Sequence, residues 1–148
     1  MANVSVGQEA PDFTLRNEDN QPVKLSEQRG KPVVLVFYPL DFSPLCTSEM
    51  CAIRDDYSSF QAKGAQVFGI SRDSTWTHKA FKEREGLKYS LLADMNGAVA
   101  KLYGAWNDAI GVAERVTVVV DKDGKVEHVE HNGVAQGRDQ KQALAAIS

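Results

Sequence analysis

The sequence predicts one α/β domain, residues 1–148, in which helices cover both faces of a mixed central β-sheet. Two segments, Val33–Tyr38 and Val116–Val120, are apolar throughout and rich in β-branched residues, which is typical of strands buried on both faces. Segments with helical spacing of apolar residues alternate with the predicted strands. Of the 148 residues, 43% are hydrophobic and 25% charged, which is enough apolar material for one core.

The first half of the chain predicts a β extension followed by a strand–helix unit. Residues 11–25 are expected to form short extended pieces that pair as a hairpin. The buried strand Val33–Tyr38 ends at Pro39, and a helix is predicted at Thr47–Ala62, before Gly64. The apolar residues of this helix recur at helical spacing: Met50, Ile53, Tyr57 and Phe60.

The second half continues the alternation and closes with a hairpin and a helix. The elements predicted there are the strand Gln66–Ser71, the helix Ser74–Glu85, the strand Tyr89–Leu92, the helix Asn96–Tyr103, the strands Val116–Val120 and Lys125–Glu130, and the helix Gln136–Ile147. The pair Asp123-Gly124 predicts a tight turn between the last two strands. The order β-α-β-α-β-β-α is that of the thioredoxin fold, here with an N-terminal β extension and an insertion between Thr75 and Tyr103.

Composition and charge argue against several classes of function. The net charge is −3 and no run of Lys or Arg exceeds two residues, so the basic patch of a nucleic-acid-binding protein is not expected. The longest apolar run, Val33–Leu40, is far shorter than the ~18 residues of a membrane span. Residues 1–11 do not resemble a secretory signal, and a cytosolic location is therefore expected.

The chain has two cysteines, Cys46 and Cys51. In a cytosolic chain of this size reactive thiols or a metal site are more plausible than a disulfide scaffold. Cys46 follows a buried strand and lies in the first turn of the next helix, and sites in α/β sheets form just beyond the carboxyl ends of strands. Free backbone N–H groups and the helix dipole favour an anion there, and hence the nucleophilic thiolate.

A thiolate in this position suits the reduction of hydroperoxides. When sulfur attacks one peroxide oxygen, the other leaves with negative charge, so hydrogen-bond donors must stabilise it. The backbone N–H groups of Leu45 and Cys46 and the hydroxyl of Ser43 are candidate donors. An arginine is also expected, because it stays charged and donates several hydrogen bonds.

The segment Pro39–Cys51 resembles the active-site motif of the peroxiredoxins, Pro-x-x-x-Thr/Ser-x-x-Cys. Pro39, Ser43 and Cys46 occupy its defined positions. Residues 7–15, the strand before the motif and Arg115 extend the resemblance over nearly the whole chain. It implies a thioredoxin-like fold, no metal or organic cofactor, a hydroperoxide substrate, and antioxidant defence as the physiological role.

The resemblance also implies a role for each residue of the motif. Cys46 would be the peroxidatic cysteine, oxidised to a sulfenic acid, and Ser43 the hydroxyl donor. Pro39 would shield the pocket. Arg115 would be the cationic partner, and Glu49 would orient that arginine.

Two peroxiredoxin subfamilies are resembled in different parts of the chain. The pair Cys46 and Cys51 is similar to the Q type, the bacterioferritin comigratory proteins, in which a second cysteine follows five residues on. Residues 103–115 and 136–140 are more similar to alkyl hydroperoxide reductase E. We therefore expect a body of the reductase E type with a Q-type cysteine pair.

The cysteine pair leaves two ways of resolving the sulfenic acid open. Cys51 is expected to condense with Cys46 to an intramolecular disulfide, which a thioredoxin, glutaredoxin or mycoredoxin-like protein would reduce. Alternatively Cys51 is a core residue and an external thiol resolves the sulfenic acid. Hydrogen peroxide and organic hydroperoxides are the expected substrates, with peroxynitrite a further candidate, and a homodimer is expected by resemblance.

Rival functions fit the sequence less well. A disulfide oxidoreductase of the thioredoxin type would have Cys-x-x-Cys, whereas the spacing here is Cys-x4-Cys. A copper carrier would add a positioned histidine to two close cysteines. His78, His128 and His131 lie far along the chain and are expected to be solvated or structural, so no metal site is predicted.

Overall fold

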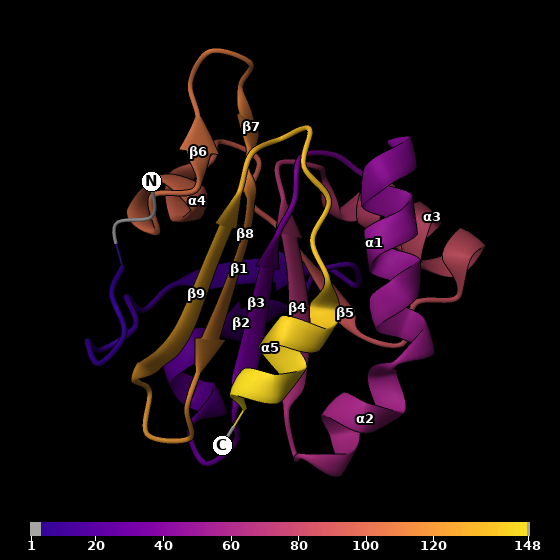
Figure 1. The fold of residues 1–148 in the computed structure, drawn as a ribbon. Helices are drawn as coiled ribbons and strands as arrows, with labels where there is room; N and C mark the ends of the chain where they lie inside the picture. The colour runs from indigo at the N-terminus through magenta and orange to yellow at the C-terminus, as the bar shows by residue number, and fades with distance from the viewer. Residues whose placement is uncertain (1–3, 148) are drawn as a thin grey trace.

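The computed structural model describes residues 4–147, which form a seven-stranded mixed sheet with helices on both faces (Figure 1). The elements are β1 (Thr14–Asn17), β2 (Pro22–Lys24), η1 (Leu25–Gln28), β3 (Val33–Phe37), α1 (Pro44–Asp55), α2 (Tyr57–Ala62), β4 (Gln66–Ser71), α3 (Thr75–Glu85), β5 (Ser90–Ala93), α4 (Ala98–Leu102), β6 (Trp106–Asn107), β7 (Val112–Ala113), β8 (Arg115–Val120), β9 (Val126–Asn132) and α5 (Gln140–Ala146). The sheet order is β2-β1-β5-β4-β3-β8-β9.

Parallel and antiparallel pairings meet at the central strand β3. β3, β4 and β5 are parallel to one another, as βαβ crossovers require, while β8 runs antiparallel to β3. β9 extends the sheet as a hairpin with β8, and β1 pairs antiparallel with β5. The hairpin expected in residues 11–25 is confirmed as β1 and β2. The turn at Asp123-Gly124 is confirmed, and Gly124 has a positive φ of 90°.

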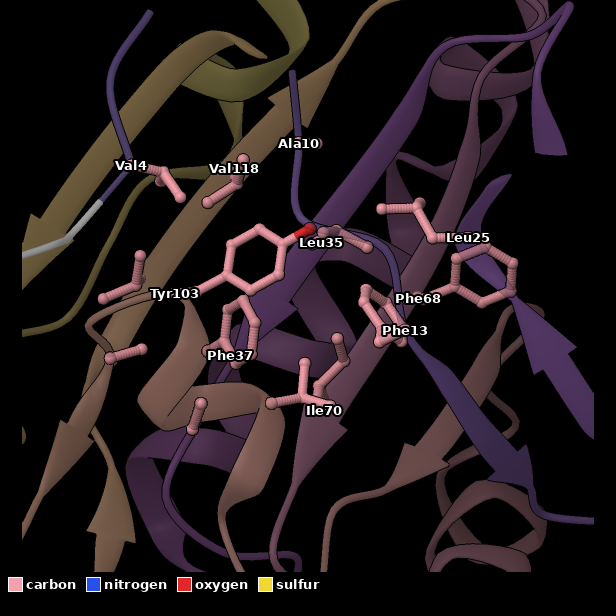
Figure 2. Close-up of a cluster of buried hydrophobic side chains, with 14 of the residues drawn as sticks. Val4, Ala10, Phe13, Leu25, Leu35, Phe37, Phe68, Ile70, Tyr103 and Val118 are labelled. Atoms are coloured by element: carbon pink, nitrogen blue, oxygen red, sulfur yellow. The ribbon is translucent and has the colours of Figure 1, made fainter. Parts of the chain in front are cut away.

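The side chains of β3 alternate between two cores, one on each face of the sheet. Val33, Leu35 and Phe37 point into one core, which Figure 2 shows with Phe13 and Tyr103. The intervening positions, Val34, Val36 and Tyr38, point into the second core, together with residues of α1, α2, α3 and α5. All six are at most 2% exposed, which explains why the strand has no polar residue.

The structure differs most from the prediction at two helices and one hairpin. The helix predicted at Thr47–Ala62 is two helices, because α1 begins earlier with Pro44 at its first position and is interrupted at Asp56, so that Phe60 of α2 turns into the core. The last helix begins at Gln140, not at Gln136, because Asp139 caps it and the residues before it bind elsewhere. The short hairpin of β6 and β7 was not predicted, since strands of two residues have no periodicity.

No helix among the described residues has both the length and the apolar character needed to cross a membrane. The helices that flank the sheet are short, and the longest, α1, has 12 residues.

The side chains packed against Gly69 of β4 predict a specific cost for a methyl group at this position. A Cβ there would lie 2.7 Å from Leu91 Cδ2 and 3.2 Å from Tyr38 Cε1. We expect Gly69→Ala to lower the free energy of unfolding by about 1–3 kcal/mol through overpacking. Urea denaturation measures this, with Gly133→Ala as the control, because its Cβ would meet only Gln136 Oε1 at 3.7 Å. Equal unfolding free energies for the two variants would contradict the described packing.

Candidate active site

The loop between β3 and α1 lies at the carboxyl end of the central strand (Figure 1), and this loop and α1 together carry all the predicted site residues except Arg115. Pro39 is buried at its start and Ser43 is half-buried at its end. Cys46 is the third residue of α1 and therefore lies in the first helical turn, as expected. Its side chain is fully buried. Burial at the carboxyl end of a strand, with free backbone N–H groups beside it, is a suitable setting for an anionic nucleophile.

Arg115, to which the resemblance assigns the role of cationic partner, contacts Cys46. Its Nη1 donates to Cys46 Sγ at 3.2 Å and to Glu49 Oε1 at 2.6 Å. The side chains of Arg115 and Glu49 are each 4% exposed. Arg115 Nε donates to the carbonyl oxygen of Val134, so the guanidinium is held from two sides. The fold therefore brings Cys46, Glu49 and Arg115 together from α1 and β8.

A second arginine, Arg138, completes this cluster and was given no role by sequence reasoning. Its backbone N–H and Nε donate to Glu49 Oε2 at 2.7 and 3.2 Å. It also donates to Thr117 Oγ1 at 3.0 Å and to the carbonyl oxygen of Phe37. The only signal in the sequence was the resemblance of residues 136–140 to one subfamily. These contacts also explain why α5 begins after Arg138 and not before it.

The electrostatics of the cluster favour negative charge at Cys46. Burial lowers the pKa of Arg138 from its ordinary value and the Glu49 carboxylate opposes that shift, so the guanidinium stays charged. Among the side chains in direct contact, two guanidinium groups face one carboxylate, which leaves one positive charge uncompensated. A thiolate at Cys46 would balance it, and buried charges are stable only when they are paired.

Ser43 is placed beside the site but is bonded within its own loop. Its Oγ donates to the carbonyl oxygen of Leu40 at 2.9 Å, and its own carbonyl oxygen accepts from Thr47 Oγ1 at 2.8 Å. A serine hydroxyl both donates and accepts, and it rotates about one bond. To serve as a donor to a substrate, it would therefore only have to exchange the Leu40 carbonyl for the substrate oxygen.

Cys51 lies on α1 away from Cys46, and both thiols are free. Its Sγ donates to Glu85 Oε1 at 3.4 Å. Burial raises the pKa of the Cys51 thiol, and the hydrogen bond to the Glu85 carboxylate raises it further. Five residues on a continuous helix place the two Cα atoms about 8–9 Å apart, whereas a disulfide needs about 4.4–6.8 Å.

Among residues 4–147, one group of side chains has the composition of a metal site: Asp41, Asp73 and His78, with one ligand atom of each within 4.8 Å of the others. These atoms are already engaged. His78 Nδ1 lies 2.6 Å from Asp41 Oδ2, and Asp73 Oδ2 accepts from Ser71 Oγ at 2.5 Å. Asp41, Asp73 and His78 therefore belong to a hydrogen-bonded network. His78 is structural and buried rather than solvated.

The contact between Arg115 and Cys46 predicts the effect of a change that keeps the charge. Arg115→Lys should lower the second-order rate constant with hydrogen peroxide, because a single ammonium nitrogen cannot reproduce the contacts of Nη1 to Cys46 and Glu49 together with the bond of Nε to Val134. Removal of one donor to developing charge costs about 10²–10³ in rate, and this partial replacement should cost less. Stopped-flow oxidation measures the constant, and a value equal to that of the wild type would contradict the assignment.

Comparisons with known proteins agree with this geometry. The model of the AhpC/TSA family matches residues 6–129. The chain is 45% identical over 132 residues to peroxiredoxin Q, chloroplastic, of Sedum lineare, covering 88% of this chain and 71% of that protein. It is 46% identical over 132 residues to peroxiredoxin Q, chloroplastic, of Arabidopsis thaliana, covering 88% of this chain and 61% of that protein.

Solved structures with a similar fold include peroxidoxin BcpB from Mycobacterium tuberculosis, with a TM-score of 0.88 and 33% identity over 97% of this chain and 96% of that one. Enterococcus faecalis AhpC has a TM-score of 0.89 and 30% identity over 96% of this chain and 89% of that one. The predicted thioredoxin-like fold is confirmed. The chain belongs to the AhpC/TSA family of peroxiredoxins, which are thiol-dependent peroxidases.

Proposed function

We propose that the protein reduces hydrogen peroxide and organic hydroperoxides with Cys46 as the peroxidatic thiol and Cys51 as the resolving thiol of the same chain. The observation that carries the first part is the 3.2 Å contact between Arg115 Nη1 and Cys46 Sγ, at a buried helix start. The identity of 45–46% to peroxiredoxin Q proteins supports a Q-type cycle. We also propose that the rest of the fold is of the alkyl hydroperoxide reductase E type, which residues 103–115 resemble.

In the first step the Cys46 thiolate attacks one oxygen of the hydroperoxide. The S–O bond forms as the O–O bond breaks, sulfur is oxidised to the sulfenic acid, and the second oxygen leaves as hydroxide or alkoxide and takes up a proton. Negative charge moves from sulfur to the departing oxygen. Arg115, bonded to the sulfur before attack, is placed to follow that charge, and Ser43 and the first helical N–H groups supply further donors.

In the second step the Cys51 thiol attacks the sulfenic sulfur of Cys46. A disulfide forms and the hydroxyl group leaves as water. Because the intact helix keeps the two Cα atoms too far apart, the first turn of α1 must unwind. The disulfide would then be reduced by a thioredoxin, glutaredoxin or mycoredoxin-like protein. The identity of the reductant, activity toward peroxynitrite, the homodimer and a cytosolic location stay predictions.

Two cysteine variants separate the roles of the thiols. Cys46→Ser should consume hydrogen peroxide at a negligible rate, because the serine hydroxyl stays protonated and the nearby Glu49 carboxylate is bound by Arg115 and Arg138. Cys51→Ser should react with the first equivalent at the wild-type rate but then accumulate a sulfenic acid, which a dimedone adduct detects. Near wild-type turnover by Cys46→Ser would overturn the first assignment. A stable sulfenic acid in the wild type would overturn the second.

The contact between Cys51 and Glu85 predicts a pH dependence. In Cys46→Ser, alkylation of Cys51 by iodoacetamide should rise with pH with a midpoint above the ordinary pKa of a cysteine thiol, because burial and Glu85 raise the pKa of Cys51. A raised pKa in the folded chain stabilises it at neutral pH, and that contribution is lost as the pH rises through the shifted pKa, so high pH lowers the free energy of unfolding.

The matched pair for this test lies on one helix. Glu85→Gln should move the alkylation midpoint to lower pH, because a carboxylate beside the thiol is replaced by a neutral amide. Glu83→Gln, at an exposed position of α3, should leave the midpoint unchanged. Equal midpoints for the two variants would show that Glu85 does not control the thiol.

A further inference from the structure

A buried chain of polar side chains lies directly behind the loop of the active site. Tyr38 Oη donates to Asp41 Oδ1 at 2.5 Å, and Asp41 Oδ2 lies 2.6 Å from His78 Nδ1. The side chains of Asp41 and His78 are 0% exposed, and Tyr38 is also fully buried. Asp41 is the middle residue of the loop between Pro39 and Ser43, so a residue of the catalytic motif is anchored by residues outside it.

The donors and acceptors of this chain fix its protons. Leu92 contributes a carbonyl oxygen 3.0 Å from His78 Nε2, and a carbonyl only accepts, so Nε2 carries a hydrogen. Burial raises the pKa of Tyr38 well above its ordinary value, so its hydroxyl remains a donor. One proton is then shared between Asp41 and His78 Nδ1, and the pair carries no net charge. It can therefore be buried without a partner ion.

Asp41 is held through its backbone as well as its side chain. Its N–H donates to Asp73 Oδ2 at 2.8 Å, and that same oxygen accepts from Ser71 Oγ. The loop is thus tied to the end of β3 by Tyr38, to the end of β4 by Asp73, and to α3 by His78. The next residue, Phe42, has a φ of 68°, in the left-handed region that a phenylalanine adopts only when its surroundings impose it.

We infer that Tyr38, Asp41 and His78 are positioning residues for peroxide reduction. They hold the strained loop so that Ser43 Oγ and the first turn of α1 face the substrate in one geometry. A displacement of about 1 Å at a reacting group costs about 10² in rate. Apolar residues of equal volume would stabilise the core at least as well as these buried polar side chains, so stability alone does not account for them. The inference rests on the proposed roles of Ser43 and Cys46.

A pair of tyrosine variants separates positioning from plain stability. Tyr38→Phe removes the hydroxyl that binds Asp41. Tyr103→Phe removes the hydroxyl of another fully buried tyrosine, which donates to the Pro11 carbonyl oxygen at 2.6 Å in the other core. We expect both variants to lower Tm to a similar extent. Only Tyr38→Phe should lower the second-order rate constant with hydrogen peroxide, by about threefold to tenfold, because only that loss reaches the loop.

Two substitutions of Asp41 supply the complementary readout. In Asp41→Asn the amide oxygen still accepts from Tyr38, and the amide nitrogen donates to Nδ1 of a neutral His78, so every hydrogen bond is kept. Its rate constant should stay within about threefold of the wild type, whereas Asp41→Leu, which breaks the chain, should lose about tenfold or more. If Asp41→Leu does not fold, the tyrosine pair decides.

The inference is overturned if Tyr38→Phe and Tyr103→Phe oxidise at the same rate, or if Asp41→Asn falls as far as Asp41→Leu. Its failure is distinct from failure of the proposed function. An inactive Cys46→Ser together with unchanged rates in the Tyr38 and Asp41 variants would remove only the positioning role. An active Cys46→Ser would remove the proposed function itself.

Discussion

The buried carboxylate of Glu49 is the constraint on which the rest of the site depends. It lies three residues after Cys46 on α1 and binds Arg115 from β8 and Arg138 from the segment before α5. Loss of one partner from a buried ion pair costs about 3–5 kcal/mol, because the remaining charge is left unpaired. The helix α1, the strand β8 and the segment before α5 therefore meet at the Glu49 carboxylate. The same carboxylate orients the Arg115 guanidinium, which contacts the reactive sulfur of Cys46.

This arrangement limits where α1 can open. From Glu49 onward the helix is held by the two arginines and by Tyr89, whose hydroxyl donates to the Met50 carbonyl oxygen at 2.7 Å. The residues before Glu49 begin at Pro44, and the Ser43 hydroxyl binds Leu40 instead of capping a helical N–H. The energetics therefore favour opening of the first turn, the turn that carries the peroxidatic thiol, over opening of the middle of the helix.

The sequence predicted the central strand and the placement of Cys46, because an apolar run and a local motif carry those signals. The grouping of Cys46 with Glu49 and Arg115 was implied by the family resemblance. The sequence did not predict the role of Arg138, which binds Glu49 across 89 positions in the chain. Nor did it predict the contact of Asp41 with His78, which lie 37 positions apart. Such pairings depend on how strands and helices pack, and no periodicity or spacing encodes them.

The central claim is that Cys46 is the sulfur that reacts with peroxide and that Cys51 closes the cycle within the chain. Mass spectrometry of the reduced protein after one equivalent of hydrogen peroxide tests it most directly. The expected product is a monomer that has lost two hydrogen atoms, with the peptides of Cys46 and Cys51 joined by a disulfide. Oxygen on Cys51 with Cys46 still reduced would contradict it.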